Sequence, residues 1–168
     1  MKFKIQDRFE GGPFDEVVHY LTEEYVFEPA NLPNVKGNKL LKEVLTEDTK
    51  YCKYEWCAHG QIPKVVQHIL KPQMLTWIEE TTLDRKAKVF KTKITPFYFK
   101  SVVSCESTLY FVKKSDDELV RITDGFLNIR IPIFGIIIEE VIIAYLKQNF
   151  AAEHKVTFKF IKEKFGKK

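Results

Sequence analysis

The sequence predicts an α+β fold in which a curved antiparallel sheet of about seven strands surrounds a long C-terminal helix. Polar and apolar residues alternate over 2–9 and in several runs between 40 and 131, which is typical of strands. Apolar residues recur at helical spacing in one stretch near the start and in one at the end, and no glycine or proline interrupts 136–165. A run of antiparallel strands between two helices indicates that the helices pack on one side of a single sheet.

The first elements are a strand and a helix. Residues 2–9 form a strand pattern, which the sequence Gly11-Gly12-Pro13 ends. Proline is favoured at the first helical position, so a helix is predicted over 13–25. The next stretch, 28–38, contains prolines, asparagines and a glycine, and is predicted to be a loop.

Six more strands and a closing helix follow. The strands form three pairs, each joined by a polar turn, at 40–45, 50–58, 74–83, 87–95, 102–113 and 118–131. A short helix over 65–70 is expected between the first two pairs. Helical spacing then runs from 132 to about 164, and the β-branched and aromatic stretch 156–160 leaves open a kink or break near its end.

Composition is typical of one globular domain spanning 1–168. The aromatic content of 14% supplies rings that can fill a core or line an apolar cavity. The net charge of +4 is small and not gathered into a stripe, which argues against nucleic-acid binding. The most apolar run, 131–138, is too short to span a membrane. Three cysteines and no signal-peptide pattern predict reduced thiols in a cytoplasmic protein.

The start of the last helix carries the most specific local pattern, Ile131-Pro132-Ile133-Phe134-Gly135-Ile136-Ile137-Ile138-Glu139. Pro132 ends the last strand, and Gly135 permits close packing against a neighbouring element. This pattern is similar to one in an uncharacterised bacterial branch of the START-like (SRPBCC) superfamily. The order of elements also resembles that superfamily, whose helix-grip fold is seen in birch-pollen-type allergens and polyketide cyclases. The resemblance implies an interior cavity for lipids, sterols, polyketides or other apolar molecules, although members also include enzymes, hormone receptors and partner-binding modules.

No catalytic, metal or cofactor site is predicted. Cys52, Cys57 and His59 are close in sequence, but a strand places Cys52 on the face opposite the other two. None of the four histidines lies in a catalytic motif, and no glycine-rich phosphate loop is present.

Polar residues on apolar strand faces are candidate anchors for the polar end of a ligand, because a charge in an apolar cavity must be paired or used. Arg121 and Asp124 are the first candidates, followed by Glu106 and Tyr110. The alternative places these residues on the convex, solvated face. The cavity wall is expected to contain Trp56, Trp77, Phe90, Leu109, Phe126, Ile137, Val141 and Tyr145, and the alternative to a cavity is a solid core.

The leading functional hypothesis is a cofactor-free binding or carrier protein for an apolar small molecule or lipid. A cyclase- or aromatase-type enzyme using Asp124, Glu106 or a histidine for proton transfer is the second hypothesis. A closed-core protein-interaction module is the third. The sequence Phe97-Tyr98-Phe99, near several lysines, indicates a cavity lid or a transient membrane contact, unless its rings are buried in the core.

Overall fold

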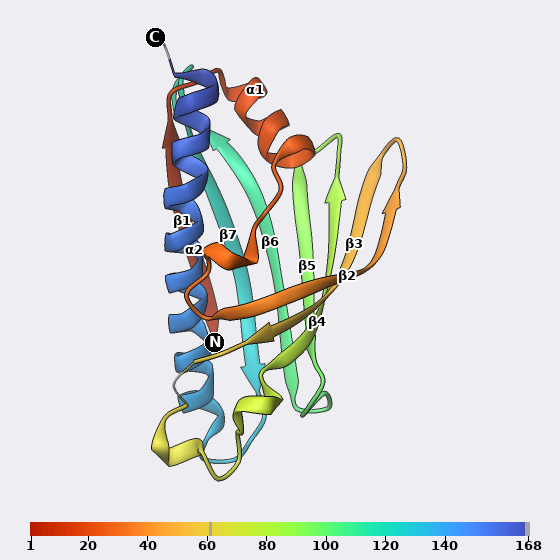
Figure 1. The fold of residues 1–168 in the computed structure, drawn as a ribbon, viewed down its shortest axis with the longest axis vertical. Helices are drawn as coiled ribbons and strands as arrows, with labels where there is room; N and C mark the ends of the chain where they lie inside the picture. The colour runs from red at the N-terminus through yellow and green to blue at the C-terminus, as the bar shows by residue number, and fades with distance from the viewer. Residues whose placement is uncertain (61, 167–168) are drawn as a thin grey trace.

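The computed structural model describes residues 1–60 and 62–166, which form one antiparallel sheet and a long helix beside it (Figure 1). The strands are β1 (Lys2–Glu10), β2 (Val35–Leu45), β3 (Thr49–Ala58), β4 (Thr76–Asp84), β5 (Val89–Pro96), β6 (Val103–Lys113) and β7 (Glu118–Ile129). Their order in the sheet is β1-β7-β6-β5-β4-β3-β2. Strands β2 to β7 are therefore sequential neighbours, and β1 joins the far edge beside β7. The predicted α+β fold with seven strands is confirmed.

The helices cover one face and one end of this sheet. Helix α1 (Phe14–His19) continues as a π-helical turn over Tyr20–Glu24, and helix α2 (Gly135–Phe165) runs without interruption. The break considered for 156–160 does not occur. Thr157 is fully buried there, and its hydroxyl donates a hydrogen bond to Glu153 one turn earlier (2.6 Å), so this β-branched residue serves packing within the helix.

The junction between β7 and α2 explains the pattern over 131–139. A Cβ atom on Gly135 would lie 2.1 Å from the carbonyl oxygen of Ile129, so only glycine fits at this approach. The Glu139 carboxylate accepts a hydrogen bond from the Ile129 amide (2.7 Å), which satisfies the last backbone donor of the strand. Both residues therefore fix the angle at which the helix leaves the sheet.

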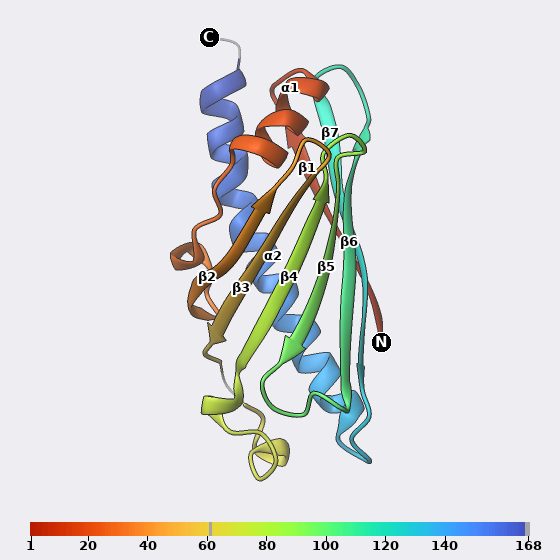
Figure 2. The same cartoon turned by 90° about the vertical axis from the view of Figure 1, so that its right-hand side faces the viewer.

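Helix α2 packs along the edge formed by β1 and β7 and crosses the strands obliquely (Figure 2). One buried cluster joins it to the sheet near the end of β7: Val66, Cys105, Leu127, Ile129, Ile138 and Ile143. A second cluster, where α1 covers the end of the sheet, contains Phe9, Val17, Val18, Leu21, Leu119 and Ile161. Each large side chain buried in this way contributes about 2 kcal/mol.

Two boundaries differ from the sequence prediction. Strand β2 begins at Val35, where a loop was expected, because an edge strand tolerates glycine and asparagine and its register with β3 contains two irregularities. Lys64–Val66 form a short 3₁₀ turn in place of the helix expected over 65–70. Among the described residues, no helix is long and apolar enough to cross a membrane.

Candidate functional site

The two faces of the sheet follow from the cross-strand register, because directly opposed residues of antiparallel strands lie on the same face. The face toward α2, here called the inner face, is marked by Cys105, Leu127 and Ile129, which pack with residues of that helix. Odd-numbered residues of β1, β4, β6 and β7 and even-numbered residues of β3 and β5 point to this face. The opposite side is the outer face.

The helix covers the inner face unevenly. It packs against β1 and β7 and touches the turn Pro29–Asn31. Farther across the sheet, most inward-facing side chains are half-buried, among them Tyr54, Glu79, Thr81 and Thr92. The centre of the inner face is therefore partly accessible, whereas the part beneath the helix is closed.

A row of small side chains crosses the centre of the inner face. The register aligns Cys52, Thr81, Thr92, Ser107 and Gly125 from β3 to β7. The flanking rows carry larger side chains: Tyr54, Glu79 and Ile94 on one side and Leu83, Phe90 and Leu109 on the other. The ring of Phe3 occupies the space over Gly125, where its Cζ atom would lie 2.4 Å from an added Cβ. The side chains of this row are thus smaller than those of the flanking rows, and Phe3 covers one end of it.

Glu79 is the titratable group beside this row. Burial raises the pKa of its carboxyl to about 7, against the lowering effects of the Thr81 hydroxyl and the Trp56 indole next to it. The indole lies close to the carboxyl without forming a hydrogen bond of normal geometry. The Thr81 hydroxyl also lies 2.9 Å from the hydroxyl of Thr92. A carboxyl with this pKa changes protonation state near neutral pH, so it can donate or accept a hydrogen bond there.

Trp56 and Trp77, the two tryptophans of the chain, form a stacked pair across β3 and β4. Their ring centroids are 6.2 Å apart, and the planes differ by 6°. Both indole N–H groups are buried and have no hydrogen-bond partner in the part of the chain that the structure describes. The Thr123 hydroxyl is the third such atom. All three belong to residues of the inner face.

Arg121, a predicted anchor, points inward but is already engaged. Its guanidinium donates to Asp7 of β1 (2.7 Å) and to Glu153 of α2 (3.1 Å), and it stacks 5.2 Å from the centre of the Phe9 ring. Burial lowers the pKa of the guanidinium, but the hydrogen bonds that it donates to Glu153 and Asp7, together with their negative charges, raise this pKa overall. The cluster contains one cation and two carboxylates, all buried. In this arrangement Arg121 joins β1, β7 and α2.

Four other predicted contacts lie on the outer face, which corrects their expected placement. Glu106, Tyr110, Asp124 and Phe126 alternate with the inward-facing residues of β6 and β7. Tyr110 donates a hydrogen bond to Asp124 (2.8 Å), and Phe126 is 39% exposed. These side chains therefore do not lie between the sheet and α2. Both faces of β7 carry apolar residues, including Ile122 on the outer side, so alternation alone does not show which face meets the helix.

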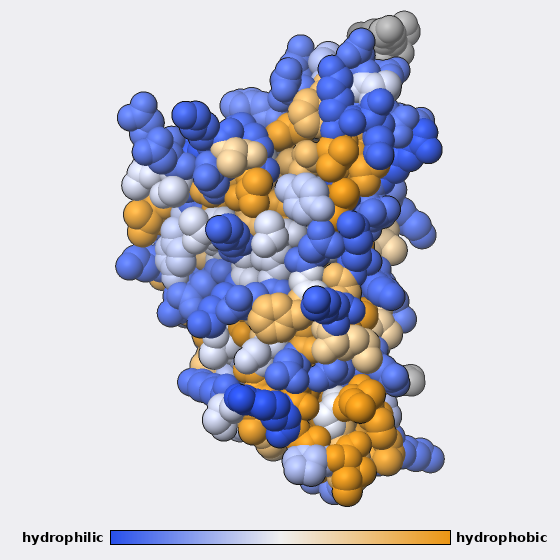
Figure 3. All heavy atoms as spheres, turned by 180° about the vertical axis from the view of Figure 1, so that it is seen from behind, coloured by the Kyte–Doolittle hydropathy of each residue, from blue (hydrophilic) through white to orange (hydrophobic). Residues whose placement is uncertain are grey.

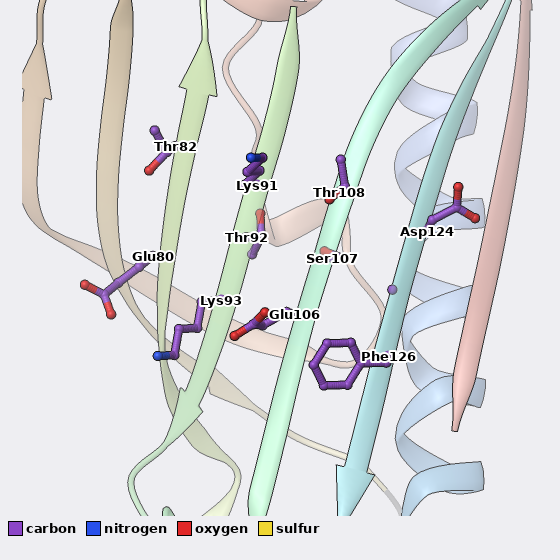
Figure 4. A pocket seen from close by; sticks show the side chains of 11 residues that line it. Glu80, Thr82, Lys91, Thr92, Lys93, Glu106, Ser107, Thr108, Asp124 and Phe126 are labelled. Carbon is purple, nitrogen blue, oxygen red and sulfur yellow. The ribbon is translucent and has the colours of Figure 1, made fainter.

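The outer face has the character of a solvated sheet surface, with hydrophilic side chains over much of it (Figure 3). It carries an open hollow of about 450 Å³, around which charges of both signs are mixed (Figure 4). The side chains that bound it include Glu80, Thr82, Lys91, Lys93, Glu106, Thr108, Asp124 and Phe126. No orphaned buried side-chain polar atom was found there among the described residues.

The other predicted wall residues are divided between the sheet and the helix. Trp56, Trp77, Phe90 and Leu109 lie on the inner face. Ile137, Val141 and Tyr145 are half-buried on α2, where the Tyr145 ring packs against Gly60. The sequence interpretation did not single out Glu79, Thr81 or Thr92. A signal for Glu79 was present, because alternation over 74–83 places this carboxylate on the face of Trp77 and Leu83.

Comparison with solved structures shows a shared fold. Norcoclaurine synthase from Thalictrum flavum, solved in complex with dopamine and hydroxybenzaldehyde, superposes with a TM-score of 0.66 at 16% identity, covering 99% of this chain and 90% of that one. The Zhui aromatase/cyclase from Streptomyces sp. R1128 gives 0.61 at 12% identity, covering 97% and 95%. A START superfamily protein from Mycobacterium smegmatis gives 0.58 at 12% identity, covering 95% and 98%. No protein-family model and no curated protein matches the chain. The fold is therefore the START-like helix-grip fold.

Proposed function

We propose that this protein binds a small amphipathic molecule, with an apolar body and a polar group, on the inner face beside α2. The observation that carries the proposal is the placement of the orphaned polar atoms. Buried polar groups in folded proteins nearly always have a hydrogen-bond partner. Here the indole N–H groups of the stacked pair Trp56 and Trp77 lack one among the described residues, and both rings belong to the inner face.

The chemistry of these groups indicates what the ligand must offer. An indole N–H only donates, so the ligand needs at least one acceptor, such as a carbonyl, ether or hydroxyl oxygen. Glu79 is the neighbouring group that can exchange a proton near neutral pH. The stacked faces of the tryptophan pair and the half-buried Tyr54 favour a flat or aromatic body. The row of small residues gives that body room.

Intrinsic fluorescence tests this proposal directly, because both tryptophans of the chain lie at the proposed site. Native mass spectrometry of freshly purified protein, followed by denaturing extraction, identifies any bound molecule. Titrating that molecule, or a panel of aromatic ketones and phenols, should change the tryptophan emission saturably. The variant Trp77→Phe, which removes one indole donor and keeps an aromatic ring, should weaken binding about tenfold.

The matched control is Glu106→Gln on the outer face, which should bind as the wild type does. An empty protein whose emission is unchanged by every probe would favour the closed-core interaction module. Equal loss of binding in both variants would place the ligand elsewhere.

A second candidate function is proton-transfer catalysis on the bound molecule. The observation that favours it is the pKa of Glu79 near 7, which suits a general acid or base at neutral pH. The similar structures named as an aromatase/cyclase and a synthase support the same direction. The test is to incubate the extracted ligand with wild type and with Glu79→Gln and to follow its mass and absorbance. Catalysis predicts conversion by the wild type, and binding without conversion by the variant.

A further inference from the structure

Three connections meet at one end of the molecule, the lower end in Figures 1 and 2. They are the β3–β4 connection (62–75), the β5–β6 connection (97–102) and the β7–α2 connection with the first helical turn (130–138). Arg130 donates a hydrogen bond to the carbonyl of Ser101 (2.6 Å), which ties the second to the third. His68 packs edge-on against Phe134 with ring centroids 5.1 Å apart, which ties the first to the third. These segments, here called the loop end, thus form one continuous surface.

The loop end exposes large apolar side chains. The exposed fractions are 86% for Ile133, 66% for Ile136, 50% for Val65, 44% for Tyr98, 41% for Phe97 and 37% for Phe99. Figure 3 shows apolar side chains gathered at this lower end. Single exposed apolar residues are normal, but a group of six on three adjoining segments marks an interaction surface.

The backbone holds two of these side chains outward at a cost. Phe99 and Ile133 have positive φ values of 61° and 69°, a region that bulky and β-branched residues rarely adopt. Such conformations persist only where the surrounding structure imposes them, and they cluster at functional positions. The backbone of the loop end therefore holds the side chains of Phe99 and Ile133 toward solvent.

The charges at the loop end have one sign. Exposed Lys64, Lys71, Lys100 and Arg130 lie on the three segments. None of the 23 aspartates and glutamates of the chain occurs in 62–75, 97–102 or 130–138, and the exposed Glu140 follows one helical turn after Ile136. Elsewhere acidic and basic residues are mixed, so the net charge of the whole chain does not reveal this local excess.

From these observations we propose that the loop end docks on an anionic lipid surface. Apolar side chains beside lysines and an arginine, with no acidic residue in the three segments, match a bilayer interface, where acyl chains take up the apolar groups and anionic headgroups bind the cations. Tyr98 and the phenylalanine rings have the amphipathic or apolar character of residues found at that depth. A protein partner of the same shape would need an acidic rim, and no acidic residue of the loop end itself would complement a second copy of this chain.

Docking also places the proposed ligand site close to the lipid. Trp56 lies two residues before the end of β3, and Trp77 is the second residue of β4, so the tryptophan pair adjoins the β3–β4 connection. The docking proposal stands independently of the ligand, because its surface is formed by other residues.

Vesicle flotation tests the proposal with the full chain. The vesicles contain phosphatidylcholine alone, or phosphatidylcholine with about 30 mol % phosphatidylserine. The wild type should float with the anionic vesicles, and added salt should weaken that binding. The variant Ile133→Ser/Ile136→Ser should lower the partition coefficient at least about tenfold. Lys64→Gln/Lys71→Gln should lower it about tenfold on anionic vesicles and little on neutral ones.

The matched control is Val26→Ser/Leu45→Ser, which removes two side chains that are 78% and 61% exposed outside the loop end. It should float as the wild type does. Because all six positions are exposed, each variant should keep the wild-type circular dichroism and melting temperature. The proposal is wrong if the wild type floats with neither kind of vesicle. It is wrong, too, if Val26→Ser/Leu45→Ser loses as much vesicle binding as Ile133→Ser/Ile136→Ser. It is also wrong if the wild type is a dimer that Ile133→Ser/Ile136→Ser converts to a monomer.

Discussion

The raised pKa of Glu79 makes the stability of this protein depend on pH in a predictable direction. In the unfolded chain the carboxyl has its ordinary pKa of 4.5, and in the folded protein the value is about 7. Between these values the folded state holds a proton that the unfolded state has released, so unfolding becomes easier as pH rises. The stability associated with Glu79 is therefore fully present below 4.5 and is lost as pH rises toward 7.

The size of the effect follows from the shift. One pKa unit corresponds to about 1.4 kcal/mol, so a rise from 4.5 to about 7 is worth about 3 kcal/mol in total. Between about pH 5 and pH 8, the part that falls in this window is about 2–3 kcal/mol. The variant Glu79→Gln has no titrating group there and should lose none of this stability.

The assay is urea denaturation of wild type, Glu79→Gln and the exposed control Glu106→Gln at the two pH values. The free energy of unfolding of Glu79→Gln relative to wild type should rise by about 2–3 kcal/mol from the lower to the higher pH. The same difference for Glu106→Gln should stay within about 0.5 kcal/mol. Parallel curves for Glu79→Gln and wild type would refute the reasoning, because they would show that the carboxyl is ionised in the folded state at little cost.

Two further predictions concern the packing of α2 on the sheet. Arg121→Met leaves two buried carboxylates without their cation and should lower the free energy of unfolding by about 3–5 kcal/mol, as measured by urea denaturation; an unchanged midpoint would contradict the role assigned to the cluster. Gly135→Ala places a methyl group against the Ile129 carbonyl and should destabilise by about 2 kcal/mol or more in thermal melts. Gly37→Ala, where nothing lies within 4 Å of the added atom, should stay within about 0.5 kcal/mol of wild type. Equal effects of the two alanines would show that the close approach at Gly135 is not limiting.

The sequence predicts most strands well because polar and apolar residues alternate along them and short polar turns join them in three pairs. Alternation also assigns each residue to one of two faces. It correctly places Arg121 and Asp124 on opposite faces of β7, as the register shows. It does not show which of those faces meets the helix, because apolar residues such as Ile122 occur on the outer side as well. The pKa of Glu79 and the orphaned indole groups depend on neighbours from other strands, so no local pattern reveals them.

The edge position of β1 has a consequence for how the chain folds. Strands β2 to β7 form a meander in which each strand pairs with the next one in the sequence, across connections much shorter than the separation between β1 and β7. Strand β1 pairs with β7, and its Asp7 is 114 positions from its partner Arg121. The same guanidinium must also find Glu153 on the last helix. Strand β1 precedes the other strands of the sheet in the sequence but is therefore among the last to pair, and its apolar face has no partner while the rest of the sheet assembles.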